Sequence, residues 1–105
     1  MTVTELSELL LSVDTEVTLL DVRLPQEREL ARIEPSLFIP LQELEERVQE
    51  LEGWREKALV VYCHHGVRSD YAVRFLTHLG FANVSNLDGG IDAWSLSIDS
   101  SVPRY

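Results

Sequence analysis

Apolar and polar positions alternate along the chain in patterns that predict both helices and strands. Short apolar runs at residues 17–22, 58–62 and 84–87 are typical of buried β-strands. Elsewhere, apolar residues recur at spacings of three and four, which predicts amphipathic helices over residues 5–12 and 41–51. The alternation of these elements predicts an α/β domain around a mainly parallel sheet.

The predicted helices have identifiable ends and core faces. Thr4 is expected to cap the first helix, and Leu6, Leu10 and Val13 are expected to face inward. The apolar stripe of residues 41–51 is likewise expected to pack into the core and not to form a binding surface.

The only cysteine, Cys63, lies directly after the strand predicted at residues 58–62. Gly66 then allows a tight turn, and a third amphipathic helix is expected after it. Backbone amides at a helix start form an anion-binding loop, and a helix N-terminus with nearby cations such as Arg68 favours the reactive thiolate. This placement predicts a nucleophilic cysteine.

Two other interpretations of Cys63 are weaker. A buried, inert thiol would have apolar neighbours, but in residues 64–69 only Val67 is apolar. His64 and His65 are also capable of binding a metal, but adjacent histidines beside one cysteine lack the ligand spacing of structural zinc sites. No metal and no organic cofactor is therefore expected.

Length and composition fit one domain. The chain has 105 residues, of which 45% are hydrophobic, enough for one core and too few for two. Its apolar runs are far shorter than a membrane span, and its N-terminus lacks the basic region of a signal peptide. We therefore expect no membrane interaction and a cytoplasmic location, where a reducing environment keeps a single cysteine available. The tail at residues 95–105 is expected to be irregular.

Charge is distributed unevenly. The net charge of −9 argues against nucleic acid or an anionic membrane surface as a partner. Residues 26–56 hold nine glutamates against four arginines, a pattern typical of solvated helix faces. Residues 63–79, in contrast, hold Arg68, Arg74 and all three histidines against one aspartate. This locally basic region is expected to steer an anionic substrate toward Cys63.

Four segments resemble, in order, the motifs of the rhodanese family. They are residues 18–23 with Asp-Val-Arg, the loop that begins at Cys63, residues 86–91 with a Gly-Gly turn, and the following pair of Ala93 and Trp94. Together they cover nearly the whole chain. The resemblance implies a single rhodanese domain over residues 1–105, with a central, mainly parallel five-stranded sheet flanked by helices.

Residues 31–40 depart from the family, which usually carries Gly-His-Ile-Pro-Gly-Ala there. Only Ile33, Pro35 and Pro40 keep the register, so the turn beside the active site is expected to be remodelled and to change substrate access. His64 also stands where many members have a basic residue, and histidine is only partly charged at neutral pH. Anion binding is then expected to depend more on the loop amides and Arg68 than on a charged side chain at position 64.

The resemblance implies a sulfurtransferase that works by double displacement. Cys63 would take a sulfane sulfur from thiosulfate or a protein persulfide and pass it to a nucleophilic acceptor. Residues 91–105 resemble rhodanese domains found alone in bacteria or at the end of enzymes that adenylate sulfur carriers, which implies a sulfur-carrier protein or a cysteine desulfurase as partner. The residues implied to hold the substrate are His64, His65, Gly66, Val67, Arg68 and Ser69, and those implied to support the loop are Asp21 and Arg23.

The roles of some polar residues stay open. Asp21 and Arg23 are expected at the carboxyl edge of the sheet, beside the Cys63 loop. For Asp21, accepting hydrogen bonds from loop amides or an arginine is favoured over acid–base catalysis. His64 and His65 either contact the substrate or face solvent while the backbone alone acts, and the sequence does not choose between these roles.

Two other functions compete with sulfur transfer. Related folds use a Cys-to-Arg loop for phosphatase or arsenate reductase chemistry, but with one residue more than the six from Cys63 to Arg68. The other competitor is a non-catalytic rhodanese-like docking module, and such modules often lack the cysteine that is present here. Loop length and the cysteine together favour sulfur transfer.

Overall fold

A computed structural model describes all 105 residues and contains one parallel sheet of four strands. The strands are β1 (Val17–Asp21), β2 (Leu37–Phe38), β3 (Ala58–Tyr62) and β4 (Val84–Asn86), in the spatial order β2-β1-β3-β4. All neighbouring strands run parallel. The three strands predicted from apolar runs are therefore confirmed, and the sheet has four strands where five were expected.

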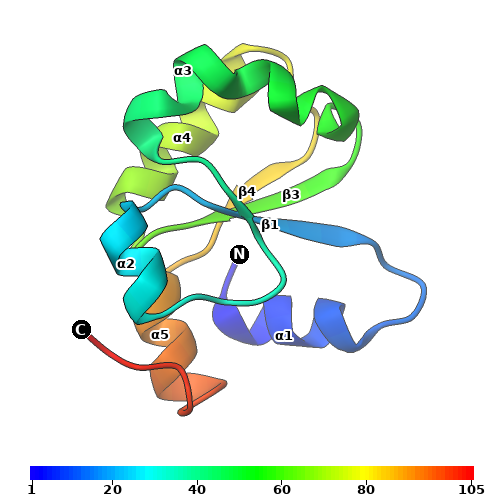
Figure 1. The fold of residues 1–105 in the computed structure, drawn as a ribbon. Coiled ribbons are helices and arrows are strands. Elements are labelled where there is room, and N and C mark those ends of the chain that lie inside the picture. Colours follow the sequence, from blue (N-terminus) through cyan, green and yellow to red (C-terminus); the bar gives the residue numbers. More distant parts are fainter.

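Helices cover both faces of this sheet (Figure 1). On one face lie α3 (Leu44–Arg47) and α4 (Val67–His78), and on the other lie α1 (Val3–Leu11) and α5 (Gly90–Ser97). The short helix α2 (Pro25–Leu30) follows the carboxyl end of β1. Two 3₁₀ helices, η1 (Leu41–Glu43) and η2 (Val48–Trp54), flank α3.

Each face of the sheet has its own hydrophobic core, because successive side chains of a strand point to opposite sides. In β3, Leu59 and Val61 join a cluster of 11 buried residues that includes side chains of α3 and α4. Val60 and Tyr62 join a second cluster of 10 buried residues that includes side chains of α1 and α5. Burial on both faces explains why the apolar run of this strand is unbroken.

The first helix begins earlier than expected. Thr2, not Thr4, is its N-cap: the Thr2 hydroxyl accepts a hydrogen bond from the Glu5 amide, and the Glu5 carboxylate accepts one from the Thr2 amide, both at 3.1 Å. This capping box fixes the start of the helix and thereby the residues that face the core. Of the three residues expected to be buried, Leu6 is buried, Leu10 is 42% exposed, and Val13, in the turn after the helix, is 98% exposed.

The helix predicted over residues 41–51 is interrupted. At its two junctions, Glu43 and Arg47 have φ values of −106° and −109° with ψ values of −4° and 8°, which separate η1, α3 and η2. The predicted core face is nevertheless present, since Leu44 and Leu51 are fully buried. Spacings of three and four residues suit both helix types, so the apolar pattern does not distinguish α from 3₁₀ turns.

The carboxyl ends of β1, β3 and β4 meet at one edge of the sheet, where the connections to α2, α4 and α5 begin. The tail expected to be irregular is partly helical, because α5 continues to Ser97. Beyond α5 the chain turns, and its C-terminal segment ends on the side of the molecule where α2 lies (Figure 1). No helix has both the length and the apolar character needed to cross a lipid bilayer.

Candidate active site

Cys63 lies between the end of β3 and the start of α4, as the sequence predicts. Its side chain is almost completely buried, and its Sγ accepts hydrogen bonds from the Gly66 amide at 3.1 Å and the Ser69 hydroxyl at 3.3 Å. Gly66 caps α4 with a φ of 110°, a left-handed conformation that glycine adopts without strain. Negative charge at this sulfur is therefore stabilised by hydrogen bonds and by the helix N-terminus.

Asn86, at the end of β4, braces this loop. Its Nδ2 donates to the Gly66 carbonyl at 3.1 Å, and its Oδ1 accepts from the Ser69 hydroxyl at 2.5 Å. Because a hydroxyl carries one proton, Ser69 donates to either Asn86 or Cys63 at any moment. Sequence analysis included Asn86 only as part of the Gly-Gly segment and did not identify it as a residue that supports the loop.

The start of α5 holds the other side of the loop. The amide of Ile91 donates to the Cys63 carbonyl at 2.9 Å, and the amide of Asp92 donates to the His64 carbonyl at 3.1 Å. Gly90 makes this approach possible, since a Cβ on it would lie 2.5 Å from both of these carbonyl oxygens and its φ is +61°. The Gly-Gly turn therefore has a direct role in positioning the cysteine.

Arg68, in the first turn of α4, faces Glu27 of α2. Its Nη1 and Nη2 donate to the two Glu27 carboxylate oxygens at 2.5 and 2.8 Å. Hydrogen bonding to Arg68 lowers the pKa of Glu27 to about 2, despite the opposing effect of burial. Arg74, the other arginine of this helix, pairs with Asp70 at 3.1 Å. The basic region seen in the sequence is thus largely matched by carboxylates.

Tyr105 lies beside the Arg68–Glu27 ion pair, and sequence analysis did not identify it as a residue of the site. Its hydroxyl donates to Glu27 at 2.6 Å and accepts from Arg23 at 2.9 Å. Its ring stacks on the ring of His64, with centroids 3.9 Å apart and planes 7° from parallel. Burial, and then the hydrogen bond to Glu27, raises the pKa of Tyr105 to about 12, so its hydroxyl keeps its proton at neutral pH. No local pattern in the tail indicates these contacts.

Asp21 and Arg23 form a buried support next to the loop. The Asp21 carboxylate accepts from Arg23 Nε and Nη2, each at 2.9 Å, and from Arg28 at 3.1 Å. This arrangement corresponds to the structural role favoured for Asp21, with arginines as the donors. Arg23 Nη2 also donates to the Ala31 carbonyl at 2.6 Å. Arg23 is linked to the Cys63 loop through Tyr105, which it contacts with its other terminal nitrogen.

The atypical segment at residues 31–40 is connected to Asp21 through hydrogen bonds of Arg28. The Ile33 amide donates to the Tyr62 hydroxyl at 3.2 Å, and the Ser36 hydroxyl lies 3.1 Å from the same oxygen. Arg28 donates to the Ser36 carbonyl at 3.0 Å. The turn is therefore anchored by the Ile33 amide and by Ser36, which bond to Tyr62 and Arg28 outside the segment.

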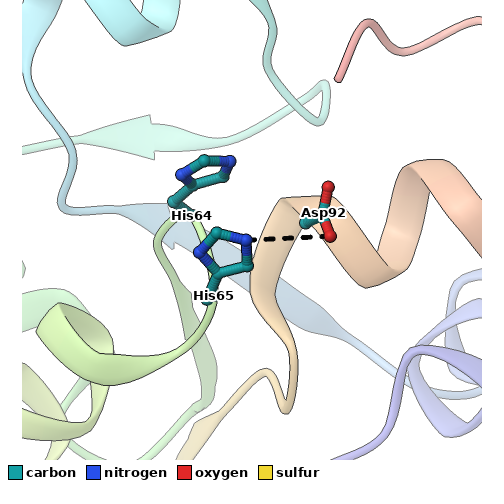
Figure 2. Close-up of side chains that lie close together, drawn as sticks. All are labelled: His64, His65 and Asp92. Carbon is teal, nitrogen blue, oxygen red and sulfur yellow. Dashed lines mark ion pairs between the residues drawn. The ribbon is translucent and has the colours of Figure 1, made fainter. Parts of the chain in front are cut away.

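His64 and His65 lie together at the rim of the loop, with ring centroids 3.9 Å apart. His64 is partly buried and its Nε2 has no hydrogen-bond partner, whereas the His65 side chain is 62% exposed. Burial, and then the neighbouring His65, lowers the pKa of His64. Asp92 approaches from α5, and its Oδ2 lies 3.7 Å from His65 Nε2 (Figure 2). Of the remaining loop residues, Val67 is 80% exposed.

Comparison with known proteins connects this geometry to a family. A family model described as rhodanese-like domain matches residues 2–97. Adenylyltransferase and sulfurtransferase MOCS3-2 of Zea mays is 41% identical over 92 residues, which cover 83% of this chain and 19% of that protein. A sulfurtransferase of Allochromatium vinosum is 37% identical over 83 residues, which cover 78% of this chain and 76% of that protein.

A solved structure shows the same fold. The rhodanese-related protein of Thermoplasma volcanium superposes with a TM-score of 0.80 at 38% sequence identity, covering 98% of this chain and 93% of that one. The chain spans about a fifth of the length of the maize relative and about three quarters of the bacterial one. The family match extends over nearly all the elements that position Cys63, and the chain therefore belongs to the rhodanese-like domain family.

Proposed function

We propose that this chain is a sulfurtransferase that carries a sulfane sulfur as a persulfide on Cys63. The relatives named sulfurtransferase support the general activity. The observation that carries the mechanism is the environment of the Cys63 sulfur, which accepts hydrogen bonds from the Gly66 amide and the Ser69 hydroxyl at the N-terminus of α4. These groups favour a sulfur nucleophile that carries negative charge.

The reaction proceeds in two displacements. In the first, the Cys63 thiolate attacks the sulfane sulfur of thiosulfate, a new S–S bond forms, and sulfite leaves with the electrons of the broken bond. In the second, a nucleophilic acceptor such as cyanide or a thiolate attacks the outer sulfur, and the Cys63 thiolate is released. The loop from His64 to Ser69 and the helix dipole stabilise the anionic persulfide between these steps.

The donor is either thiosulfate or a protein persulfide. Because Arg68 is paired with Glu27, the attraction of the loop for a small dianion is weaker than the sequence alone suggests. A protein donor such as a cysteine desulfurase, with a sulfur-carrier protein as acceptor, depends less on this attraction. The name of the maize relative, which joins adenylyl transfer to sulfur transfer, is consistent with such a relay. We place this activity in the cytoplasm, where the thiol stays reduced.

The phosphatase and arsenate reductase alternatives have less support. Each of these reactions needs a loop arginine that is free to bind the outer oxygens of a tetrahedral anion. In this structure the two terminal nitrogens of Arg68 already bind Glu27. A docking module without activity does not need a cysteine held by two hydrogen-bond donors.

Intact mass spectrometry tests the proposal directly. The reduced protein is incubated with thiosulfate or with a persulfidated cysteine desulfurase, and its mass is measured before and after addition of an acceptor. We expect a one-sulfur increment that the acceptor removes and that is absent in Cys63→Ser. If neither donor produces this increment, or if Cys63→Ser still transfers sulfur from thiosulfate to cyanide, the mechanism is wrong.

A further inference from the structure

Three side chains that bind metals well meet at the rim of the Cys63 loop, separate from the Cys63 sulfur itself. His64 and His65 come from the loop after β3, and Asp92 comes from the first turn of α5 (Figure 2). Their ligand atoms all lie within 4.8 Å of one another. The two elements are fixed relative to each other by the hydrogen bond of 3.1 Å from the Asp92 amide to the His64 carbonyl.

We propose that His64, His65 and Asp92 form a three-ligand site for a divalent transition metal, with Zn²⁺ as the best match. Two imidazole nitrogens and one carboxylate oxygen are an ordinary ligand set for this ion. At bond lengths of about 2.0 to 2.2 Å, two ligands of a tetrahedral ion are separated by roughly 3.4 Å. The 3.7 Å between His65 Nε2 and Asp92 Oδ2 is close to this value, and all three ligand atoms already lie within 4.8 Å of one another, so only small side-chain adjustments separate them from binding distance.

The state of each ligand supports this assignment. His64 Nε2 is buried without a hydrogen-bond partner, which is unfavourable for a polar atom unless something binds to it. Asp92 Oδ1 accepts from Arg104 Nε at 2.9 Å, and Oδ2 accepts a longer hydrogen bond from Arg104 Nη2 at 3.4 Å, which together orient the carboxylate with Oδ2 toward His65. His65 is exposed and therefore provides a route by which an ion enters from solvent.

The ligands of this site differ from the group of Cys63, His64 and His65 that the sequence offers as possible metal ligands. Cys63, His64 and His65 are adjacent in sequence, but the Cys63 sulfur is directed toward Gly66 and Ser69. Asp92 lies far along the chain from the histidines and reaches them only because α5 packs against the loop. Three protein ligands leave a fourth position for water or an anionic group, as in open zinc sites.

Metal titration of the purified protein tests the proposal independently of sulfur transfer. Zn²⁺ binding is measured by calorimetry, and Co²⁺ binding by its visible absorption, for the unmodified protein and for His65→Ala and Asp92→Asn. Both substitutions change side chains at the rim, and folding is checked by circular dichroism. Two controls are His78→Ala, which removes the one remaining histidine at the end of α4, and Cys63→Ser, which removes the thiol.

We expect one ion per chain, bound with similar affinity by the unmodified protein and both controls. Loss of either rim ligand should weaken binding at least about tenfold. The Co²⁺ spectrum should lack a thiolate charge-transfer band. Failure of the unmodified protein to bind either ion, unchanged affinity in His65→Ala and Asp92→Asn, or loss of binding in Cys63→Ser would each overturn the proposal. None of these results depends on whether Cys63 forms a persulfide.

Discussion

Arg68 and Glu27 form a two-pronged ion pair between α4 and α2, with N–O distances of 2.5 and 2.8 Å. The pair brings together residues separated by 41 positions and places a carboxylate beside the cation expected to attract anionic donors. Such a carboxylate offsets the field of the arginine at the loop. Glu27 is therefore predicted to weaken the attraction of the site for an anionic donor such as thiosulfate.

Replacing Glu27 by Gln should improve capture of thiosulfate. With the carboxylate charge removed, we expect the KM for thiosulfate to fall about two- to fivefold at low ionic strength and the difference to shrink as salt is added. Arg68→Ala should have the opposite effect. Steady-state kinetics over a range of salt concentrations measure both, with exposed Glu29→Gln on the same helix as control. An unchanged KM in Glu27→Gln would mean that Arg68 is purely structural.

The same ion pair should make folding stability depend on pH. The pKa of Glu27 falls from its ordinary 4.5 to about 2 in the folded protein. Its stabilising effect is therefore complete above about pH 4.5 and is lost as the pH falls toward 2. Urea unfolding at pH 7 should show that Glu27→Gln is about 1 to 2 kcal/mol less stable than the unmodified protein. The expected loss is this small because solvent around Arg68 screens the ion pair. A difference that does not narrow between pH 4.5 and 3 contradicts this.

Gly90 should tolerate no side chain. A Cβ at this position would lie 2.5 Å from the Cys63 and His64 carbonyl oxygens, and backbone atoms held by α5 cannot move aside easily. We expect Gly90→Ala to lose about 2 to 4 kcal/mol of stability and most of its sulfur transfer. Gly53→Ala is the matched control, since its Cβ would contact nothing within 4 Å. Comparable thermal stability of the two variants would show that the close approach of α5 is not required.

Tyr105 should stabilise the corner formed by Arg23 and Glu27. Tyr105→Phe removes the hydroxyl that bonds both residues but keeps the ring that stacks on His64. We expect a loss of about 1 to 2 kcal/mol in the free energy of unfolding, because charged groups lose a hydrogen-bond partner. Tyr71→Phe changes an exposed tyrosine and serves as control in urea unfolding. Equal stability of both variants would argue that the tail contact is weak.

Loop length should decide the reaction class. A six-residue loop leaves room for one extra sulfur on Cys63 but little for a phosphoryl group, so the unmodified protein should not hydrolyse aryl phosphates usefully. Inserting one glycine between Gly66 and Val67 should lower sulfur transfer and admit weak inhibition by phosphate or vanadate. Aryl phosphate turnover and phosphate inhibition are measured for both proteins. Efficient hydrolysis by the unmodified protein would favour the phosphatase alternative.

Features that depend on neighbouring residues could be predicted from the amino-acid sequence. The apolar run of β3 predicts a strand buried on both faces, and Cys63 after it predicts a reactive thiol at the carboxyl edge of the sheet. The tight turns at Gly66 and at the Gly-Gly pair can likewise be predicted from the sequence, because all three glycines adopt positive φ values that other residues avoid. Each of these features depends on neighbours within a few residues.

The charges and aromatic rings that surround the cysteine became known only from the packed fold. Glu27, Asp92 and Tyr105 reach the loop from α2, α5 and the tail, and no periodicity in the sequence relates these segments to Cys63. The break of the helix predicted over residues 41–51 was equally hidden, because apolar spacing suits both α and 3₁₀ turns. Local patterns specify which face of an element is buried, whereas contacts between distant polar side chains depend on how the completed elements pack.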